Sequence, residues 1–259
     1  MPSEQDPYAK GMVASGEHFD LTPELDLFQY RMIKPHLGKD ILEIGAGSGR
    51  ISLLLLRDDL SYHRFVINEP SDHFFAQLKK QVGTLPDAAI LTQGETSDLK
   101  EQYPSTFDTI FSVDVLEHVE DDRRYVEDCL AMLKPGGKLI ALVPALQFLY
   151  SDLDRKIGHY RRYDKTMVRR LINGLGCEIA QMYYTNFLAV FASLMVFKIG
   201  NLGYHRNESN QKRFIFLLKI YSKYVVPVMD TMERYIPIPI GLNLTVILEK
   251  SGAAPATAP

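Results

Sequence analysis

The stretch Ile41–Arg50, ILEIGAGSGR, decides the fold class of this chain. Its apolar run contains one carboxylate, Glu43, and leads into glycines at every second position: Gly45, Gly47 and Gly49. An apolar strand followed by a glycine-rich turn and a helix is how a nucleotide-binding α/β unit usually begins. The stretch therefore predicts a cofactor loop at the carboxyl end of a buried strand.

The spacing of these glycines separates two classes of cofactor. The NAD fingerprint G-x-G-x-x-G requires a glycine at its sixth position, where the two registers of this loop place Arg50 and Ser52. A carboxylate two residues before the first glycine would repel a pyrophosphate and attract a cation. Because S-adenosylmethionine (SAM) carries a sulfonium and an ammonium but no phosphate, the loop favours SAM over NAD.

Strand-like and helix-like segments alternate around this loop. DILEI and HRFVINE read as buried strands, DHFFAQLKKQV and DDRRYVEDCLAMLK as helices, and a fifth strand, KLIALVP, is expected to begin after the Pro-Gly-Gly stop. The alternation predicts a doubly wound, Rossmann-like α/β fold with helices on both faces of a parallel sheet. We divide the chain into a flexible N-terminal arm or lid (1–21), a cofactor-binding core with a substrate loop at 144–164 (22–186), a helical cap (187–240), the final strand of the core (241–250) and a disordered tail (251–259).

Charge balance and cysteine content limit the classes of function. The 259 residues have a formal net charge of −3, without the basic excess that broad nucleic-acid binding needs. Cys129 and Cys177 lie far apart in the sequence, without the spacing of a metal site, so both are expected to be packing residues. Free thiols are typical of a reducing compartment, so a cytoplasmic protein is expected. The first twenty residues lack the apolar segment of a signal peptide. The longest apolar run, Phe187–Phe197, has about half of the ~20 residues that a membrane helix needs.

Acidic residues and glycines follow the second and third expected strands. Glu69 closes the second strand, where a carboxylate can accept both ribose hydroxyls of a nucleoside cofactor. After the third strand, Gly94, Glu95 and Thr96 lie at the carboxyl edge of the sheet, where backbone groups and an acidic side chain can bind an adenine amino group. Both features indicate a nucleoside cofactor without distinguishing SAM from NAD.

The segments from Asp40 to Pro144 resemble the class I SAM-dependent methyltransferases, in particular the ubiquinone/menaquinone-type branch that methylates small molecules. The resemblance rests on LEIGAGSG, INE, GETSDL, FDTIFSVDVLEHVED and LKPGGKLIALVP, in the family's order and spacing. It implies a seven-stranded mixed sheet whose last two strands form an antiparallel pair. It also implies a SAM site formed by Glu43, Gly45, Ala46, Gly47, Gly49, Glu69, Pro70, Gly94, Glu95, Thr96, Asp114, Val115 and His118.

Two histidines are candidates for a general base. His118 follows the fourth expected strand, where the tetrapeptide LEHV either supplies a base or only closes the cofactor site. His159 lies in the segment YSDLDRKIGHYRRYD, which follows the fifth strand, where open α/β sheets bind their ligands. The candidates for substrate binding in this segment are Tyr150, Tyr160, Arg161, Arg162 and Tyr163.

Two roles are open for the arginines of this segment. Arg161 and Arg162 can hold a carboxylate or phosphate of the acceptor, or they can pair with the neighbouring aspartates and brace the loop. Asp152, Asp154 and His159 are residue types that bind metals, but no further ligand cluster accompanies them. No metal site is therefore assigned.

The expected cap contains two apolar-rich helical stretches, Phe187–Gly200 and Arg213–Tyr235. They can pack against the sheet, form a dimer interface, or enclose an apolar acceptor that is reached from a membrane surface. In the last case, anionic headgroups would suit four basic residues, Lys212, Arg213, Lys219 and Lys223. The sequence leaves these alternatives open, as it does the choice between monomer and homodimer.

Together these features predict an enzyme that transfers a methyl group from SAM to a small acceptor, to an oxygen in preference to a nitrogen or a carbon. The chain has SVDVLEH where amino-methylating nucleic-acid enzymes carry an Asn/Asp-Pro-Pro-aromatic motif, so no nucleic-acid partner is expected. The alternative is a non-catalytic SAM-binding or scaffolding protein of the same fold, because fold alone does not establish catalysis.

Overall fold

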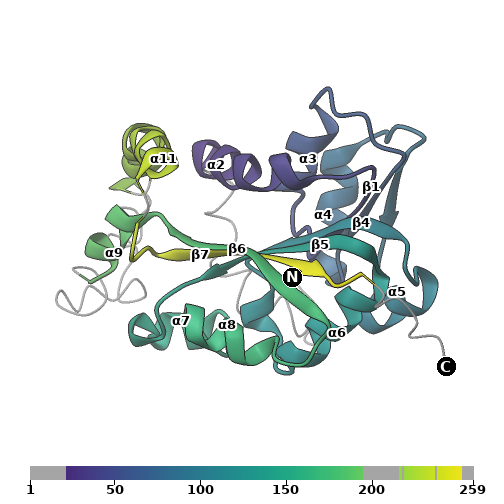
Figure 1. Ribbon diagram of the computed structural model, residues 1–259. Helices are drawn as coiled ribbons and strands as arrows, with labels where there is room; N and C mark the ends of the chain where they lie inside the picture. The colour runs from purple at the N-terminus through teal and green to yellow at the C-terminus, as the bar shows by residue number, and fades with distance from the viewer. Residues whose placement is uncertain (1–21, 195–215, 218, 237, 253–259) are drawn as a thin grey trace.

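The structure is a computed structural model that describes residues 22–194, 216–217, 219–236 and 238–252. Its centre is a seven-stranded sheet of order β3-β2-β1-β4-β5-β7-β6 (Figure 1). The strands are β1 (Asp40–Ile44), β2 (Arg64–Asn68), β3 (Ala89–Thr92), β4 (Phe107–Val113), β5 (Leu133–Pro144), β6 (Cys177–Thr185) and β7 (Asn243–Lys250). The first five are parallel, and β7 runs antiparallel between β5 and β6. The predicted Rossmann-like mixed sheet with an antiparallel last pair is confirmed.

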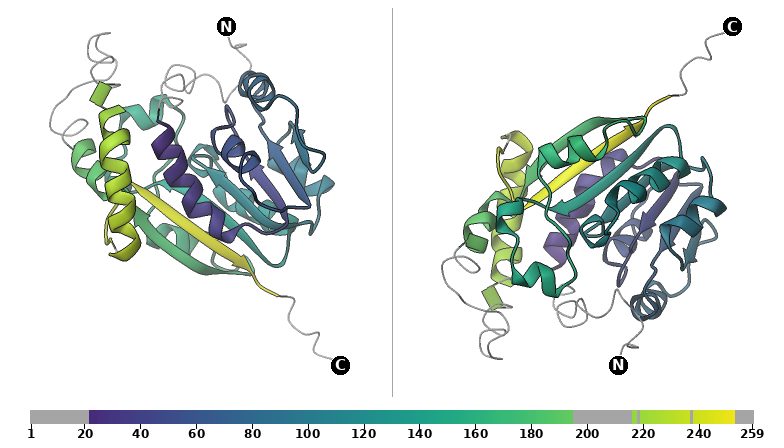
Figure 2. Two further views of the ribbon diagram at one scale, coloured as in Figure 1. Left: turned by 90° about the horizontal axis from the view of Figure 1, so that it is seen from above. Right: turned by 90° about the horizontal axis from the view of Figure 1, so that it is seen from below.

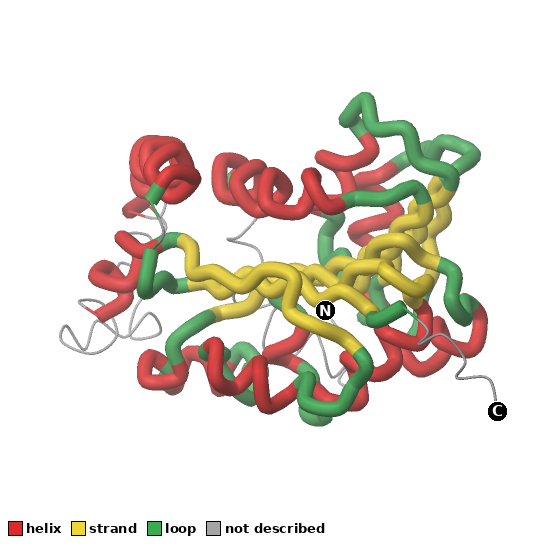
Figure 3. The backbone as a smooth tube through the Cα atoms, viewed as in Figure 1, coloured by secondary structure: helices red, strands yellow, loops and turns green. Residues whose placement is uncertain are grey.

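Helices cover both faces of the sheet (Figures 2 and 3). On one face lie α2 (Pro23–Ile33), α3 (Arg50–Leu56) and α4 (Asp72–Val82); on the other lie α5 (Thr96–Gln102), α6 (Asp122–Met132), α7 (Asp152–Lys156) and α8 (Lys165–Leu171). Successive side chains of β1 point to opposite faces. Ile41 therefore packs with Ile33 and Leu55, whereas Leu42 packs with Val126. Burial on both faces explains why the parallel strands read as continuous apolar runs.

Two local elements differ from the sequence-based expectation. The fifth strand begins at Leu133 rather than at Lys138, because the Pro-Gly-Gly segment stays within the strand where the pairing between β4 and β5 shifts register. Residues 96–102, for which no helix was predicted from the sequence, form helix α5, so Thr96 begins a helix at the cofactor edge. This helix begins with a capping box in which the Glu95 side chain accepts from the backbone at Asp98 and the Asp98 side chain accepts from Glu95 N.

The part of the cap that the structure describes joins β6 to β7 beside α2. It contains α9 (Phe187–Ser193), a π-helical turn (Tyr221–Val225) and α11 (Val226–Tyr235). The turn replaces regular helix just before Pro227, a residue that cannot supply a backbone N–H. Arg31 of α2 pairs with Asp230 of α11 at 2.8 Å. The arm 1–21, residues 195–215 of the cap and the tail from 253 lie outside the described residues.

The outward side of this cap is apolar. Tyr224, Val228 and Tyr235 are each more than half exposed, as are Phe191 and Phe216. No helix within the described ranges is long and apolar enough to cross a bilayer. The three expected roles of the cap, in packing, in a dimer or at a membrane surface, remain predictions.

Candidate active site

The glycine loop between β1 and α3 turns at the carboxyl end of the sheet. Gly45, Gly47 and Gly49 have φ values of 71°, 56° and 92°, a region that disfavours residues with a Cβ. A Cβ on Gly45 would lie 2.5 Å from Val115 Cγ2, whereas one on Gly47 would meet no atom within 4 Å. The loop is therefore packed tightly against the end of β4 at Gly45, and it is open to a ligand at Gly47.

Glu43 joins β1 to α3 behind this loop. The carboxyl group is buried, and Ser52 Oγ donates a hydrogen bond to Glu43 Oε2 at 2.5 Å. Burial raises the pKa of Glu43 to about 7; the Ser52 hydrogen bond and the charge of Arg50 oppose this shift, and the charge of Glu69 reinforces it. A cation bound nearby would lower this pKa and favour the ionised carboxylate.

Glu69, directly after β2, is oriented by backbone N–H groups. Its Oε2 accepts from Gly47 N at 2.7 Å and its Oε1 accepts from Ser71 N at 2.9 Å. The intervening Pro70 has no N–H group to compete for the carboxylate. Because a carboxylate oxygen has more than one lone pair, both oxygens can accept a further hydrogen bond. The structure thus brings together two of the predicted cofactor residues, Gly47 and Glu69.

Asp114 and its neighbour Val115 form the opposite side of the loop. Asp114 has a φ of 54°, and its backbone N donates to Leu142 O at 2.9 Å. Burial raises the pKa of its carboxyl group, against the charges of Arg50 and His159 and the contact with Gln29. Gln29 Nε2, in α2, lies 3.5 Å from Asp114 Oδ2. Gln29 was not predicted from the sequence, because it lies in an amphipathic helix far from the motifs.

A cleft of about 760 Å³ connects the predicted adenine side to the predicted substrate loop. Glu95 and Thr96 lie on one side, next to Gly94, whose carbonyl accepts from Asn68 Nδ2 at 3.1 Å. The rest of the lining comes from Ser97, His118, Val119, Glu120, Asp121, Arg124, Tyr125, Asp128, Lys156, Ile157, Gly158 and Tyr160. Segments that are distant in sequence therefore meet around one space large enough for a small molecule.

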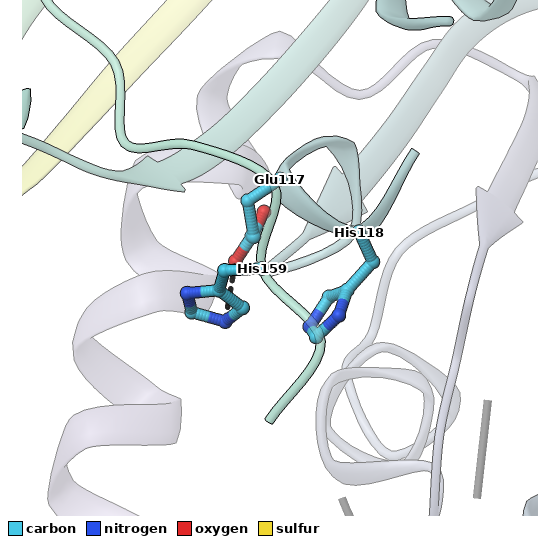
Figure 4. A group of neighbouring side chains, drawn as sticks. All are labelled: Glu117, His118 and His159. Carbon is cyan, nitrogen blue, oxygen red and sulfur yellow. Dashed lines mark ion pairs between the residues drawn. The ribbon is translucent and has the colours of Figure 1, made fainter. Parts of the chain in front are cut away.

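Glu117, His118 and His159 lie together (Figure 4), and His118 lines the cleft. The imidazole rings of His118 and His159 meet edge to face, with centroids 4.6 Å apart. His159 Nε2 lies 3.8 Å from Glu117 Oε1. Burial and the charge of His159 lower the pKa of His118 to about 4, against a contact with the Gly158 backbone. His118 is therefore neutral at physiological pH.

A buried carboxylate, Asp154, orients His159. It accepts hydrogen bonds from His159 Nδ1 at 3.1 Å, Arg162 Nε at 2.7 Å and Ser151 Oγ at 2.8 Å. Burial opposes ionisation of Asp154, but these hydrogen bonds and the Arg162 charge prevail and hold its pKa below the usual value. With Nδ1 committed to Asp154, His159 presents Nε2 toward Glu117 and His118.

The other residues proposed to bind substrate mostly hold the loop itself. Arg161 donates to the carbonyls of Val119 and Glu120 and pairs with Asp122 at 2.7 Å. Tyr163 is in the core, and its hydroxyl donates to Asp122 at 2.9 Å.

Arg162 is bound to Asp154, and the Tyr150 hydroxyl donates to His159 O at 2.7 Å. Of the five candidates, Tyr160 alone both lines the cleft and is half exposed. The geometry differs from the predicted substrate role of Arg161 and Arg162 and corresponds to the bracing alternative.

The metal-ligand types noted in the sequence do not come together as one group. The side chain of Asp152 is 84% exposed and pairs with Arg155 at 2.7 Å, away from Asp154 and His159. The group that does form within the described residues replaces both aspartates by Glu117 and His118. Glu117, which stands beside His118 in LEHV, was not predicted as a ligand, because burial of a carboxylate cannot be read from a motif.

Comparison with known proteins identifies relatives of the cofactor half of the chain. Residues 42–139 match a family described as a methyltransferase domain. The chain is similar to the ubiquinone biosynthesis O-methyltransferase of Coxiella burnetii, with 29% identity over 103 residues, 39% of this chain and 42% of that protein. It thus spans about two fifths of the length of this curated relative.

Solved structures are similar in fold to nearly the whole chain. A chain from the complex between the Haloferax volcanii Trm112 methyltransferase activator and a methyltransferase superposes with a TM-score of 0.62 and 15% identity, over 96% of this chain and 100% of that one. Phosphoethanolamine N-methyltransferase 2 of Haemonchus contortus, whose structure was solved with SAM, superposes with a TM-score of 0.62 and 14% sequence identity. The superposition covers 97% of this chain and 61% of that one. At these identities the likeness shows the fold.

Proposed function

Because this chain belongs to the class I SAM-dependent methyltransferases, we propose that it transfers the methyl group of SAM to an oxygen of a small acceptor. One observation carries the choice of oxygen: the imidazole of His118, which lines the cleft, is paired with that of His159, which is held by a buried aspartate. A hydroxyl acceptor must lose its proton, and this pair of imidazoles can assist that loss.

The residues at the glycine loop fit SAM. Glu43, Glu69 and Asp114 surround the loop with carboxyl groups, and the neighbouring cation, Arg50, is paired with Asp26. Such a surrounding attracts a sulfonium and an ammonium and repels a pyrophosphate. The open face at Gly47 lets a ligand approach the backbone, and Glu69 is oriented to accept ribose hydroxyls. We assign the adenine to the side of the cleft lined by Glu95 and Thr96.

Bound SAM supplies an electrophilic methyl group on a sulfonium that leaves as a neutral thioether. The task of the protein is to align the acceptor oxygen with this methyl group and to exclude water. His118 lines the cleft, so an acceptor in the cleft meets it first, and Tyr160 borders the same space. His159 stands behind His118, and Asp154 can stabilise positive charge on the His159 ring when a proton reaches the pair.

The proposed function is tested by calorimetric titration with S-adenosylhomocysteine, with NAD as the control, followed by transfer of radiolabelled methyl groups to a panel of phenols, catechols and hydroxy acids. We expect binding of S-adenosylhomocysteine alone and labelled product that is stable as an ether or an ester. Labelled amines from a matched amine panel, with no labelled oxygen product, would refute the choice of oxygen. Binding of S-adenosylhomocysteine without any transfer would favour the alternative, a non-catalytic SAM-binding protein.

The raised pKa of Glu43 predicts that the affinity for SAM depends on pH. Its pKa is raised to about 7, so below pH 7 a cationic ligand must bind to a mostly neutral carboxyl group or displace its proton. We therefore expect SAM to bind about 15-fold more tightly at pH 7 than at pH 5.5, since the ionised fraction of Glu43 rises by about that factor. Titration calorimetry at the two pH values measures this difference.

The control is Glu43→Gln, which keeps an acceptor for the Ser52 hydroxyl but removes the titration. Its affinity for SAM should be lower at pH 7 and nearly the same at both pH values. A pH dependence that survives in this variant would assign the titration to another carboxyl group, such as Asp114.

A further inference from the structure

The group of Glu117, His118 and His159 has the composition of a metal site. One ligand atom from each residue lies within 4.8 Å of the other two, and no second group of this kind occurs in the part of the chain that the structure describes. The residues come from two segments: Glu117 and His118 end the 3-10 turn Leu116–His118, and His159 follows α7. The turn and the loop are joined by Tyr160 N, which donates to Glu117 O at 2.8 Å.

Glu117 has a buried carboxyl group that accepts no hydrogen bond from the described residues, and this points to a cation as its partner. Its side chain is fully buried, and neither carboxylate oxygen accepts a hydrogen bond from any described group. A buried carboxylate without a hydrogen bond or a close cation is strongly unfavourable. The nearby cation, Arg162, donates instead to Asp154 and lies 3.5 Å from Ala145 O. Glu117 Oε1 faces His159 Nε2 at 3.8 Å (Figure 4), and one carboxylate oxygen lies within 4.8 Å of a ring nitrogen of each histidine.

The surroundings of His159 match those of a metal-binding histidine. Such histidines commonly donate from one ring nitrogen to a carboxylate, which fixes the ring and leaves the other nitrogen for the metal. His159 Nδ1 donates to Asp154 at 3.1 Å, and Asp154 is in turn fixed by Arg162 and Ser151. His159 Nε2 is thereby presented to the group as an acceptor atom.

We propose that Glu117, His118 and His159 bind one divalent first-row transition cation of the Zn²⁺, Co²⁺ or Mn²⁺ kind. Two imidazoles and one carboxylate are the ligands that these ions accept, and three protein ligands leave an open coordination position. Ligand atoms about 2.1 Å from a tetrahedral ion lie about 3.4 Å apart, so the group must contract by roughly 1 Å around the ion. The open position faces the cleft, since His118 is one of its lining residues.

This site deepens the proposed function and rests on it for its chemical role. The cation binds the acceptor oxygen and lowers the pKa of its hydroxyl group, so that the proton is lost to water. The O–C bond then forms as the C–S bond breaks, and the sulfur keeps the electron pair. With one ring nitrogen of each histidine bound to the ion, the histidines act as ligands in place of the base role considered above.

The test uses the full chain without an affinity tag, stripped with a chelator and titrated with CoCl₂, ZnCl₂ and MnCl₂. We expect one equivalent of Co²⁺ or Zn²⁺ to bind with a Kd in the micromolar range or tighter, and Co²⁺ to give visible d–d absorption. Glu117→Gln and His159→Gln should each weaken binding at least about tenfold. Asp152→Asn and His63→Gln, which change an exposed acid of the same loop and an exposed histidine elsewhere, should leave binding unchanged.

Absence of stoichiometric binding, or equal binding by wild type, Glu117→Gln and His159→Gln, would overturn the site. Should Glu117→Gln fail to fold, His159→Gln alone decides, because its side chain retains some exposure. Equal methyl transfer by stripped and loaded protein would overturn the role of the cation in the reaction. Metal binding that is lost in the variants, together with no methyl transfer under any condition, would uphold the site and refute the proposed function.

Discussion

Glu69→Ala is expected to weaken binding of S-adenosylhomocysteine at least about 100-fold. In the proposed site Glu69 forms charge-assisted hydrogen bonds with two ribose hydroxyls, each worth about 1.5–3 kcal/mol. The substitution also frees Gly47 N and Ser71 N, which the carboxylate now orients, so the glycine loop loses a brace as well. Titration calorimetry measures the affinity, and thermal unfolding shows whether the fold is retained.

Two further variants make this result specific. Glu69→Gln keeps the size of the side chain and one acceptor oxygen, so its loss should be intermediate. Glu101→Ala removes an exposed acid from α5 and should bind as the wild type does. An unchanged Kd for a folded Glu69→Ala variant would remove Glu69 from the cofactor site.

His159→Gln is expected to lower kcat for methyl transfer by about 100-fold or more and to leave the Kd of S-adenosylhomocysteine unchanged. Loss of a positioned acid-base group commonly lowers turnover by 10²–10⁴-fold, and loss of a ligand to an essential metal acts on the same step. The residue lies beside Glu117 and His118 and takes no part in the hydrogen bonds that hold Glu43 and Glu69 at the glycine loop, so cofactor affinity should not change.

The pH profile of kcat separates a catalytic from a structural role of His159. If the residue only braces the loop, His159→Gln will lower the unfolding temperature while the variant that remains folded keeps the wild-type turnover and pH profile. His63→Gln is the matched control for a histidine on the surface. Turnover equal to wild type in a folded His159→Gln variant would return His159 to a structural role.

The fold could be predicted from the sequence because its strands are buried on both faces. Such strands read as apolar runs with glycines at their ends, and the family motifs fix their order. The segment Pro135–Gly137 was misjudged because proline and glycine usually end an element, whereas here they stay within β5 at a shift in pairing. Helix α5 was missed because its seven residues show no apolar periodicity.

The candidate site was predictable where chemistry depends on the backbone and less so where it depends on burial. Gly47 and Glu69 follow from the loop and the end of a strand, and the structure brings them together. The sequence left open whether Arg161 and Arg162 bind an acceptor or brace their own loop. The carboxylate that binds Arg162 lies in the same loop, whereas the carbonyls that bind Arg161 come from the segment after β4, a contact that the sequence does not show. Glu117 has no visible role until its burial without a hydrogen-bond partner is known.

The position of β7 has a consequence for the order of folding during synthesis. Because β7 pairs with β5 on one side and β6 on the other, β6 has no neighbour in the sheet until Asn243–Lys250 has left the ribosome. Until then the nascent chain carries an unpaired edge on β5, a feature that promotes association between chains. A chain shortened before Asn243 would keep every group of the candidate site and still leave β6 without a partner strand.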